Sequence, residues 1–296
     1  MRHKLTLLFT LLLLVPNFAG ETTPRLRKRV SEVRLALVAT DQNNRPLPNL
    51  SPADMTVLDD GRPISHFELR SAADLPLRLG IVLDLSDSTR ESWASVRSAL
   101  IDSLQQVLRP KDEILVLTFS SEIAMQRILT DPAQLDSTLQ NPTAGGLTAL
   151  YDSIYRTCDH TLFNTDAEPH RSAIILFSDG EDNLSRHSLN EAIAKAQLTG
   201  IAIYTLVNHK AKKVKQGDFV LRDLATASGG RDFVVKDARD LQAALSAING
   251  ELRSSYLLYY RPPDESGVRT FRRVFVLPTQ TNGSHLRSRT GYFTTP

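Results

Sequence analysis

Three short segments of the chain carry hydroxyl and carboxylate side chains at spacings that suit a metal ion. Asp84, Ser86 and Ser88 follow an apolar run, and alternate side chains of an extended segment point the same way. Thr148 opens a helical stretch after two glycines, and Asp179 follows a second apolar run. One or two carboxylates with neutral hydroxyls suit a small hard cation, so we expect Mg²⁺ or Mn²⁺. No His or Cys joins the set, which makes it a poor match for zinc.

The elements around these segments alternate between strand and helix patterns. Residues 77–85 form a near-continuous apolar run, typical of a parallel strand buried on both faces. Further strand patterns follow at 113–120, 172–178, 201–207 and 232–235. Helical patterns lie between and after them, at about 91–108, 132–139, 148–160, 189–198, 220–228 and 240–255. This order predicts an α/β fold with a doubly wound, mostly parallel sheet and helices on both faces. Ligands of such sheets bind at the carboxyl ends of strands, where Asp84 and Asp179 fall.

The two flanks of this α/β stretch have strand patterns without a helical period. The N-terminal flank shows strands at 33–38, 55–58 and 64–69, and the turn residues Asp59-Asp60-Gly61 suggest a hairpin between the last two. The C-terminal flank shows strands at 256–262, 270–278 and 285–293. We expect both flanks to form one small all-β accessory module. The predicted division is a signal peptide at 1–20, a β-rich segment at 21–76, the α/β domain at 77–250 and a β-strand segment at 251–296.

The first 20 residues have the layout of an export signal. A basic start, Arg2-His3-Lys4, precedes an apolar run from Leu5 to Pro16, and the small pair Ala19-Gly20 follows. The run is short for a bilayer span, although an uncleaved anchor or a buried helix is the alternative. We therefore expect a secreted or periplasmic protein with no stable membrane insertion after the signal is removed.

The charge of the remaining chain is balanced. The sequence has 35 Lys and Arg against 33 Asp and Glu, and residues 1–20 contain two of the basic residues and no acid, which leaves 33 of each. Nothing in this balance favours a nucleic acid or an anionic membrane surface as a partner. Cys158 is the only cysteine and recurs at helical spacing with Leu150 and Ile154, so we expect a buried thiol and no internal disulfide.

Taken together, the three polar segments resemble the metal-ion-dependent adhesion site of von Willebrand factor type A domains. Asp84, Ser86 and Ser88 match the D-x-S-x-S element, Thr148 matches the Thr of the second loop, and Asp179 matches the Asp of the third. The resemblance covers about residues 77–250. It implies that these five side chains hold the cation directly or through water, and that a carboxylate of a partner protein is its last ligand. The flanks are similar to those of exported bacterial proteins of this type, abundant in acidobacteria.

Several neighbouring residues depart from the family pattern or have other roles. Asp87 and Thr89 flank the serines where many relatives carry a small residue and Met, and Asp87 adds negative charge near the ion. Leu147 separates the glycines from Thr148, so we expect a slightly shifted second loop. Thr148 can also cap the following helix. We expect Glu181 and Asp182 to be solvated, Asp152 to support the loop, and His187 to be a surface residue.

These observations predict a non-enzymatic, secreted, metal-dependent protein-binding module. The sequence contains none of the motifs G-x-S-x-G, H-E-x-x-H, G-x-G-x-x-G or a Walker loop. One alternative is a scaffolding role in which the metal only stiffens the loops. A weaker one is a metal-dependent phosphohydrolase with Asp84 as nucleophile, but Ser86 stands where such enzymes need a second Asp. No feature indicates an oligomeric state.

Overall fold

The computed structural model describes most of the chain after residue 31. The described residues are 32–87, 89, 93–129, 134, 139, 145–160, 163, 169–208, 215–263, 268–280 and 283–294. The predicted signal peptide at 1–20, Ser88 and most of the predicted helix at 132–139 lie outside them. Among the described residues, no helix combines the length and the apolar character that a membrane crossing requires.

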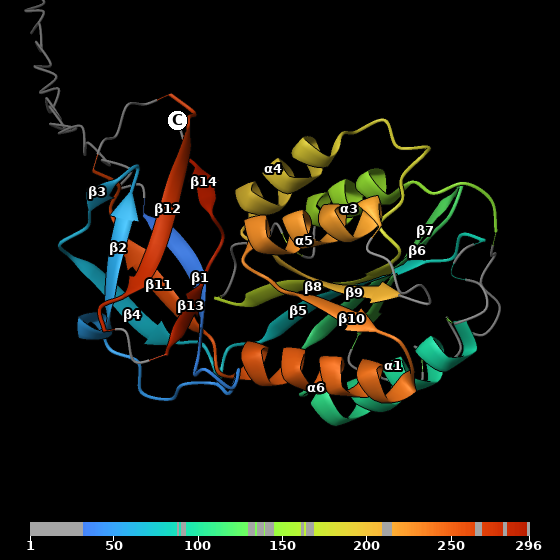
Figure 1. Cartoon of the computed structure of the whole chain (residues 1–296), viewed down its shortest axis with the longest axis horizontal. Helices are drawn as coiled ribbons and strands as arrows, with labels where there is room; N and C mark the ends of the chain where they lie inside the picture. The colour runs from blue at the N-terminus through green and yellow to red at the C-terminus, as the bar shows by residue number, and fades with distance from the viewer. Residues whose placement is uncertain are drawn as a thin grey trace, which may run out of the picture. The chain divides into compact units, whose positions relative to one another are not determined.

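A six-stranded sheet forms the centre of the α/β layer (Figure 1). Its strand order is β10-β9-β8-β5-β6-β7. The strands are β5 (Leu77–Asp84), β6 (Glu113–Phe119), β7 (Ile123–Leu129), β8 (Arg171–Ser178), β9 (Ala202–Asn208) and β10 (Asp232–Val235). All neighbours are parallel except β6 and β7. The predicted doubly wound, mostly parallel sheet is therefore confirmed, and β7 is an edge strand that the sequence patterns did not indicate.

Helices cover both faces of this sheet. On one face lie α3 (Leu150–Asp159), α4 (Leu189–Thr199) and α5 (Gln216–Ser228), and on the other lie α1 (Trp93–Val107) and α6 (Ala238–Arg253) (Figure 1). Local chemistry sets the helix ends. Ser188 and Glu191 form a capping box at the start of α4, and Gly200 ends it in the left-handed region at φ 71°.

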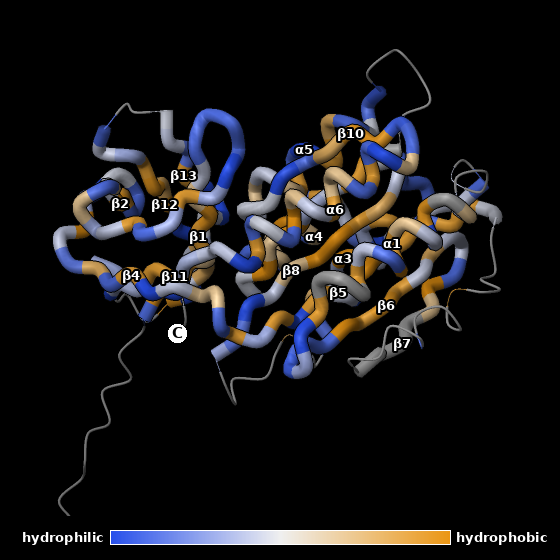
Figure 2. The backbone as a smooth tube through the Cα atoms, turned by 90° about the horizontal axis from the view of Figure 1, so that it is seen from below, coloured by the Kyte–Doolittle hydropathy of each residue, from blue (hydrophilic) through white to orange (hydrophobic). Residues whose placement is uncertain are grey.

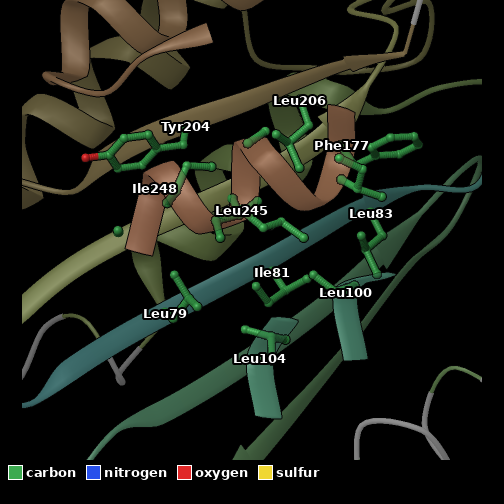
Figure 3. Close-up of a cluster of buried hydrophobic side chains, with 14 of the residues drawn as sticks. Leu79, Ile81, Leu83, Leu100, Leu104, Phe177, Tyr204, Leu206, Leu245 and Ile248 are labelled. Carbon is green, nitrogen blue, oxygen red and sulfur yellow. The ribbon is translucent and has the colours of Figure 1, made fainter. Parts of the chain in front are cut away.

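The sheet is apolar on both faces because each face is buried under helices. Figure 2 shows the apolar residues concentrated along β5, β6 and β8. In Figure 3, Leu79, Ile81 and Leu83 of β5 lie in one cluster with Leu100 and Leu104 of α1. Burying each such side chain contributes roughly 1.5–3 kcal/mol, so this packing fixes the strand ends that carry the polar loops.

Two antiparallel sheets built from both flanks form an all-β module. The first has the order β13-β1-β11-β4, and the second has the order β14-β12-β2-β3. Their strands are β1 (Val33–Thr40), β2 (Met55–Asp59), β3 (Arg62–Pro63), β4 (Phe67–Ser71), β11 (Tyr256–Tyr260), β12 (Phe271–Pro278), β13 (His285–Arg287) and β14 (Gly291–Phe293). A short 3₁₀ turn, Pro52–Asp54, precedes β2. Side chains from both sheets share one apolar core, so the expected accessory module is present.

The predicted hairpin between 55–58 and 64–69 is only half right. Asp60 and Gly61 do turn the chain, with φ 48° and 78°, but the strand that follows the turn and pairs with β2 is the two-residue β3, while β12 pairs with the other edge of β2. Strand β4 pairs instead with β11 in the other sheet. The reason is packing, because Phe67 and Leu69 of β4 lie against the core shared by the two sheets.

The α/β layer is inserted between two paired strands of the β module. Ser71 of β4 stands opposite Tyr256 of β11, and the Ala72 amide donates to the Ser255 carbonyl at 2.9 Å. An ion pair between the buried carboxylate of Glu251 in α6 and Arg287 of β13 joins the layer to the module, and Arg231 of the layer pairs with the same carboxylate at 3.3 Å.

Candidate metal centre

The polar loops meet where the connectivity of the sheet reverses. From β5 the chain continues through α1 to β6 on one side, whereas β8 lies on the other side of β5. Such a switch point opens a crevice beyond the carboxyl ends of the two central strands. Asp84 is the last residue of β5, and Asp179 directly follows the end of β8.

Asp84 is held rigidly at this point. Its carboxylate is fully buried, and Oδ1 accepts a hydrogen bond from the Ser86 amide at 2.9 Å. Its Oδ2 accepts one at 2.7 Å from the hydroxyl of Ser178, which in turn accepts from the Gly180 amide at 3.0 Å. Ser178 therefore links the loop after β5 to the loop after β8.

The environment of Asp84 favours a nearby positive charge. Burial raises the pKa of the Asp84 carboxyl above its usual value, and the neighbouring Asp179 carboxylate adds to the rise, while the hydrogen bonds from Ser86 and Ser178 oppose it. A carboxylate whose charged form is disfavoured by burial gains most from a cation placed against it.

The first loop is closed by Thr89, a residue that departs from the family pattern. Its hydroxyl donates to the carbonyls of Asp84, at 2.7 Å, and Ser86, at 3.1 Å. Both Ser86 and Thr89 are buried. Asp87 is exposed, and its carboxylate accepts from the Gly146 amide at 3.3 Å. Asp87 therefore ties the first loop to the second.

The second loop depends on its glycines. Gly145 and Gly146 have φ of 114° and 93°, and the Gly145 amide donates to the Leu85 carbonyl at 2.7 Å. A Cβ on Gly146 would lie 2.5 Å from the Ser121 hydroxyl, which accepts from the Leu147 amide at 2.9 Å. The loop thus lies close against the end of β6 while Leu147 points outward.

Thr148 is buried beside the third loop. Its amide donates to the Asn183 side chain at 2.8 Å, and its carbonyl accepts from the amides of Asn183 and Leu184, each at 3.1 Å. The expectation that Thr148 also caps the helix is wrong. Ala149 occupies that position, and no side chain of the cap residue bonds to the helix.

Asp182 of the third loop satisfies the helix end instead. Its carboxylate accepts from the Tyr151 amide at 3.0 Å and from the Ser185 hydroxyl at 2.5 Å. The expectation of a solvated Asp182 is therefore wrong, because the open start of α3 supplies it with a donor. Glu181 is exposed, as expected, while Asp179 is buried and its Oδ1 accepts from the Glu181 amide at 3.2 Å.

Asp152 supports the loop, as predicted. Its Oδ1 accepts from the amides of Arg186 and His187 at 3.1 and 2.9 Å, and Nδ1 of His187 lies 2.7 Å away. The His187 ring stacks on Tyr155 with centroids 3.9 Å apart. This pair fastens the far end of the loop to α3.

The start of α5 packs directly on the residues after β8. A Cβ on Gly217 would lie 2.1 Å from the Asp179 carbonyl oxygen, and a Cβ on Gly180 would lie 2.2 Å from the Gly217 carbonyl oxygen. Only glycines allow this approach of two backbones. No sequence pattern indicated this contact.

Hydrogen bonds bring the three loops of the predicted site together. The loops of Asp84 and Ser86, of Thr148, and of Asp179 are joined pairwise by hydrogen bonds, whereas Ser88 lies outside the described residues. Within the described ranges, no three His, Cys, Asp or Glu side chains cluster as metal ligands. The predicted site residues of these loops offer the carboxylates of Asp84 and Asp179 and the hydroxyls of Ser86 and Thr148, which are oxygen donors of the kind that a hard cation takes.

Comparison with known proteins identifies the fold. No protein-family model matches the chain, and no curated protein matches it. Among solved structures, a von Willebrand factor type A protein from Catenulispora acidiphila has a TM-score of 0.53 and 12% identity, covering 90% of this chain and 75% of that one. Proximal thread matrix protein 1 from the mussel byssus, with a zinc-occupied MIDAS motif, has a TM-score of 0.52 and 14% identity. That match covers 66% of this chain and 49% of the mussel chain, so the likeness spans about half of the mussel protein. The chain therefore has the von Willebrand factor type A fold, as the resemblance of its three loops predicted.

Proposed function

We propose that this chain is a metal-dependent binding module whose cation captures an acidic side chain of a partner protein. The observation that carries the proposal is the fully buried Asp84 carboxylate at the switch point of the sheet, fixed by Ser86 and Ser178. Asp84, Ser86, Ser88, Thr148 and Asp179 would hold the cation, directly or through water. Each carboxylate oxygen has a second lone pair, so the hydrogen bonds to Asp84 leave it able to serve the cation.

The donor set favours binding of an acidic group. Two carboxylates, Asp84 and Asp179, match the two charges of the cation, and the remaining ligands are neutral hydroxyls. Such a cation acts as a Lewis acid with affinity for one more oxygen anion. The buried position of Asp84, with both oxygens accepting hydrogen bonds, disfavours a nucleophilic role and hence the phosphohydrolase alternative.

The identity of the metal and the place of action are part of the proposal. The oxygen donors suit Mg²⁺ or Mn²⁺, and the zinc-occupied MIDAS of the mussel protein makes Zn²⁺ a necessary arm of the test. We propose that residues 1–20 direct export, so that the module acts outside the cytoplasm. Residues 77–250 would form the metal-binding domain, supported by the β module from both flanks.

Isothermal titration of the full chain with each metal tests the site. We expect Mg²⁺ or Mn²⁺ to bind and the Thr148→Ala substitution to weaken binding about tenfold, equivalent to about 1.4 kcal/mol. Thr157→Ala is the matched control, because Thr157 is also buried but its hydroxyl donates to the Ser153 carbonyl within α3. Circular dichroism checks that both variants fold. Absence of binding at millimolar concentrations of all three metals would refute the site.

Partner capture tests the function. The immobilised chain is exposed to the exported protein fraction with Mg²⁺, with EDTA, and with the Asp84→Ala variant in place of the natural chain. We expect capture only by the natural chain with metal. Metal binding without metal-dependent capture would favour the scaffolding alternative. Phosphatase turnover that Asp84→Asn abolishes would contradict a non-enzymatic module.

A further inference from the structure

Two leucines stand exposed beside the candidate metal centre. Leu147 is 50% exposed and Leu184 is 40% exposed, although both are large apolar residues. Leu147 directly precedes Thr148, and the Leu184 amide donates to the Thr148 carbonyl at 3.1 Å. Both leucines therefore flank the one residue that the second loop contributes to the site.

The backbones of both leucines are fixed while their side chains face solvent. The Leu147 amide donates to the Ser121 hydroxyl at 2.9 Å, and Gly146 before it lies against the same hydroxyl. Leu184 follows Asn183, whose side chain accepts from the Thr148 amide at 2.8 Å. Apolar side chains presented on fixed backbone lose little conformational entropy when a partner covers them.

The carboxylates around the site weaken its attraction for an acidic partner at a distance. Asp84 and Asp179 balance a divalent cation, and the exposed acids Asp87 and Glu181 stand in the same two loops. Four carboxylates thus face two positive charges. These carboxylates reduce the long-range steering of an acidic segment, so the affinity for that segment depends more on coordination and on short-range apolar contact.

We infer that the partner segment carries a bulky apolar side chain beside its acidic residue, and that Leu147 and Leu184 receive it. This inference rests on the proposed function, because the acidic residue is placed by the cation. Covering a half-exposed leucine removes apolar surface from water, so replacing either leucine with serine weakens binding about 5- to 10-fold.

Selection from a phage-displayed library of random linear peptides provides the probe. The library is bound to the full chain in Mg²⁺, or in the metal that titration identifies, and eluted with EDTA. We expect the enriched peptides to contain Asp or Glu next to Leu, Ile or Phe. Their affinities are then measured by fluorescence polarisation against Leu147→Ser, Leu184→Ser and the double variant.

Leu198→Ser is the matched control. Leu198 is 38% exposed, lies near the end of α4, and belongs to none of the three loops. We expect this variant to keep its peptide affinity within about twofold and all variants to bind the metal as the natural chain does.

The outcomes separate the inference from the proposed function. Failure to bind metal refutes both. The inference is overturned if the metal-dependent peptides lack an apolar residue next to their acidic residue, or if they bind the double variant as tightly as the natural chain. Either result leaves the proposed metal-dependent capture intact. Metal binding with no EDTA-elutable peptide also counts against the inference.

Discussion

Ser178→Ala removes a single hydroxyl that joins two loops of the metal centre. The Ser178 hydroxyl is fully buried, donates to Asp84 Oδ2 at 2.7 Å and accepts from the Gly180 amide at 3.0 Å. Alanine fits the same space but leaves a buried carboxylate oxygen and a buried amide without these partners. Each unpaired group costs about 1–3 kcal/mol, and the charged one lies at the upper end, so we expect a loss of about 3–5 kcal/mol.

A matched control isolates the effect of the two unpaired groups. Ser153 is also fully buried, but its hydroxyl donates at 2.7 Å to the Leu150 carbonyl, three residues earlier in the same helix. Helix carbonyls have a backbone donor of their own, so we expect Ser153→Ala to cost less than about 1 kcal/mol.

Urea unfolding followed by circular dichroism gives the unfolding free energy of both variants, and thermal unfolding gives their Tm. For a chain of this size, 1 kcal/mol corresponds to about 2–4 °C in Tm, so Ser178→Ala lowers Tm by roughly 6–20 °C. Saturating metal should reduce the difference in unfolding free energy between Ser178→Ala and the natural chain, because the cation stabilises the carboxylate that has lost its hydrogen bond. Unfolding free energies of the two alanine variants that agree within about 0.5 kcal/mol would refute the reasoning.

Three further predictions concern the surroundings of the site. Gly217→Ala places a Cβ 2.1 Å from a backbone oxygen, so this variant should destabilise the chain and weaken metal binding. In the control Gly250→Ala, the nearest atom to the new Cβ is 4.0 Å away, so the variant should leave the stability unchanged or raise it by up to about 1 kcal/mol. Equal urea midpoints for the two would contradict this. Burial raises the pKa of Cys158 to about 12, so iodoacetamide should label this thiol at pH 8 only after the chain unfolds. Labelling of the folded chain at the rate of a free thiol would contradict the burial of Cys158. Burial alone would raise the pKa of Asp152, but hydrogen bonds from His187 and its neighbour lower it below 3.8. Its carboxylate therefore stabilises the fold above that pH, and this effect is lost as the pH falls through the lowered pKa. The Tm deficit of Asp152→Asn at pH 7 should therefore shrink as the pH falls below 3.8, and a deficit independent of pH would argue against the pairing.

Local sequence patterns predicted the α/β layer because its elements are set by local chemistry. Apolar runs such as 77–84 predict buried strands, and apolar residues at helical spacing predict helices. The partner of β4 was not predictable in this way. An Asp-Gly turn specifies where the chain reverses, but β4 pairs with β11, a strand about 185 residues later in the sequence.

The candidate site also contains residues that local patterns identify and residues whose roles depend on distant partners. Asp84, Thr148 and Asp179 could be picked out by residue type and by their position after strands or before a helix. Ser178 and Asp182 could not be assigned roles, since their partners lie 94 and 31 residues away. The one local sign was a polar residue closing an otherwise apolar strand immediately before Asp179.

The adjacency of Ser71 and Tyr256 also determines how the chain responds to mechanical tension. Because the α/β layer leaves and rejoins the β module at neighbouring, hydrogen-bonded residues, its two ends are already together. Tension between the first and last strands of the module is borne by the hydrogen bonds between paired strands and bypasses residues 72–255. The geometry of the metal centre is therefore insulated from a pull on the flanks until β4 and β11 separate.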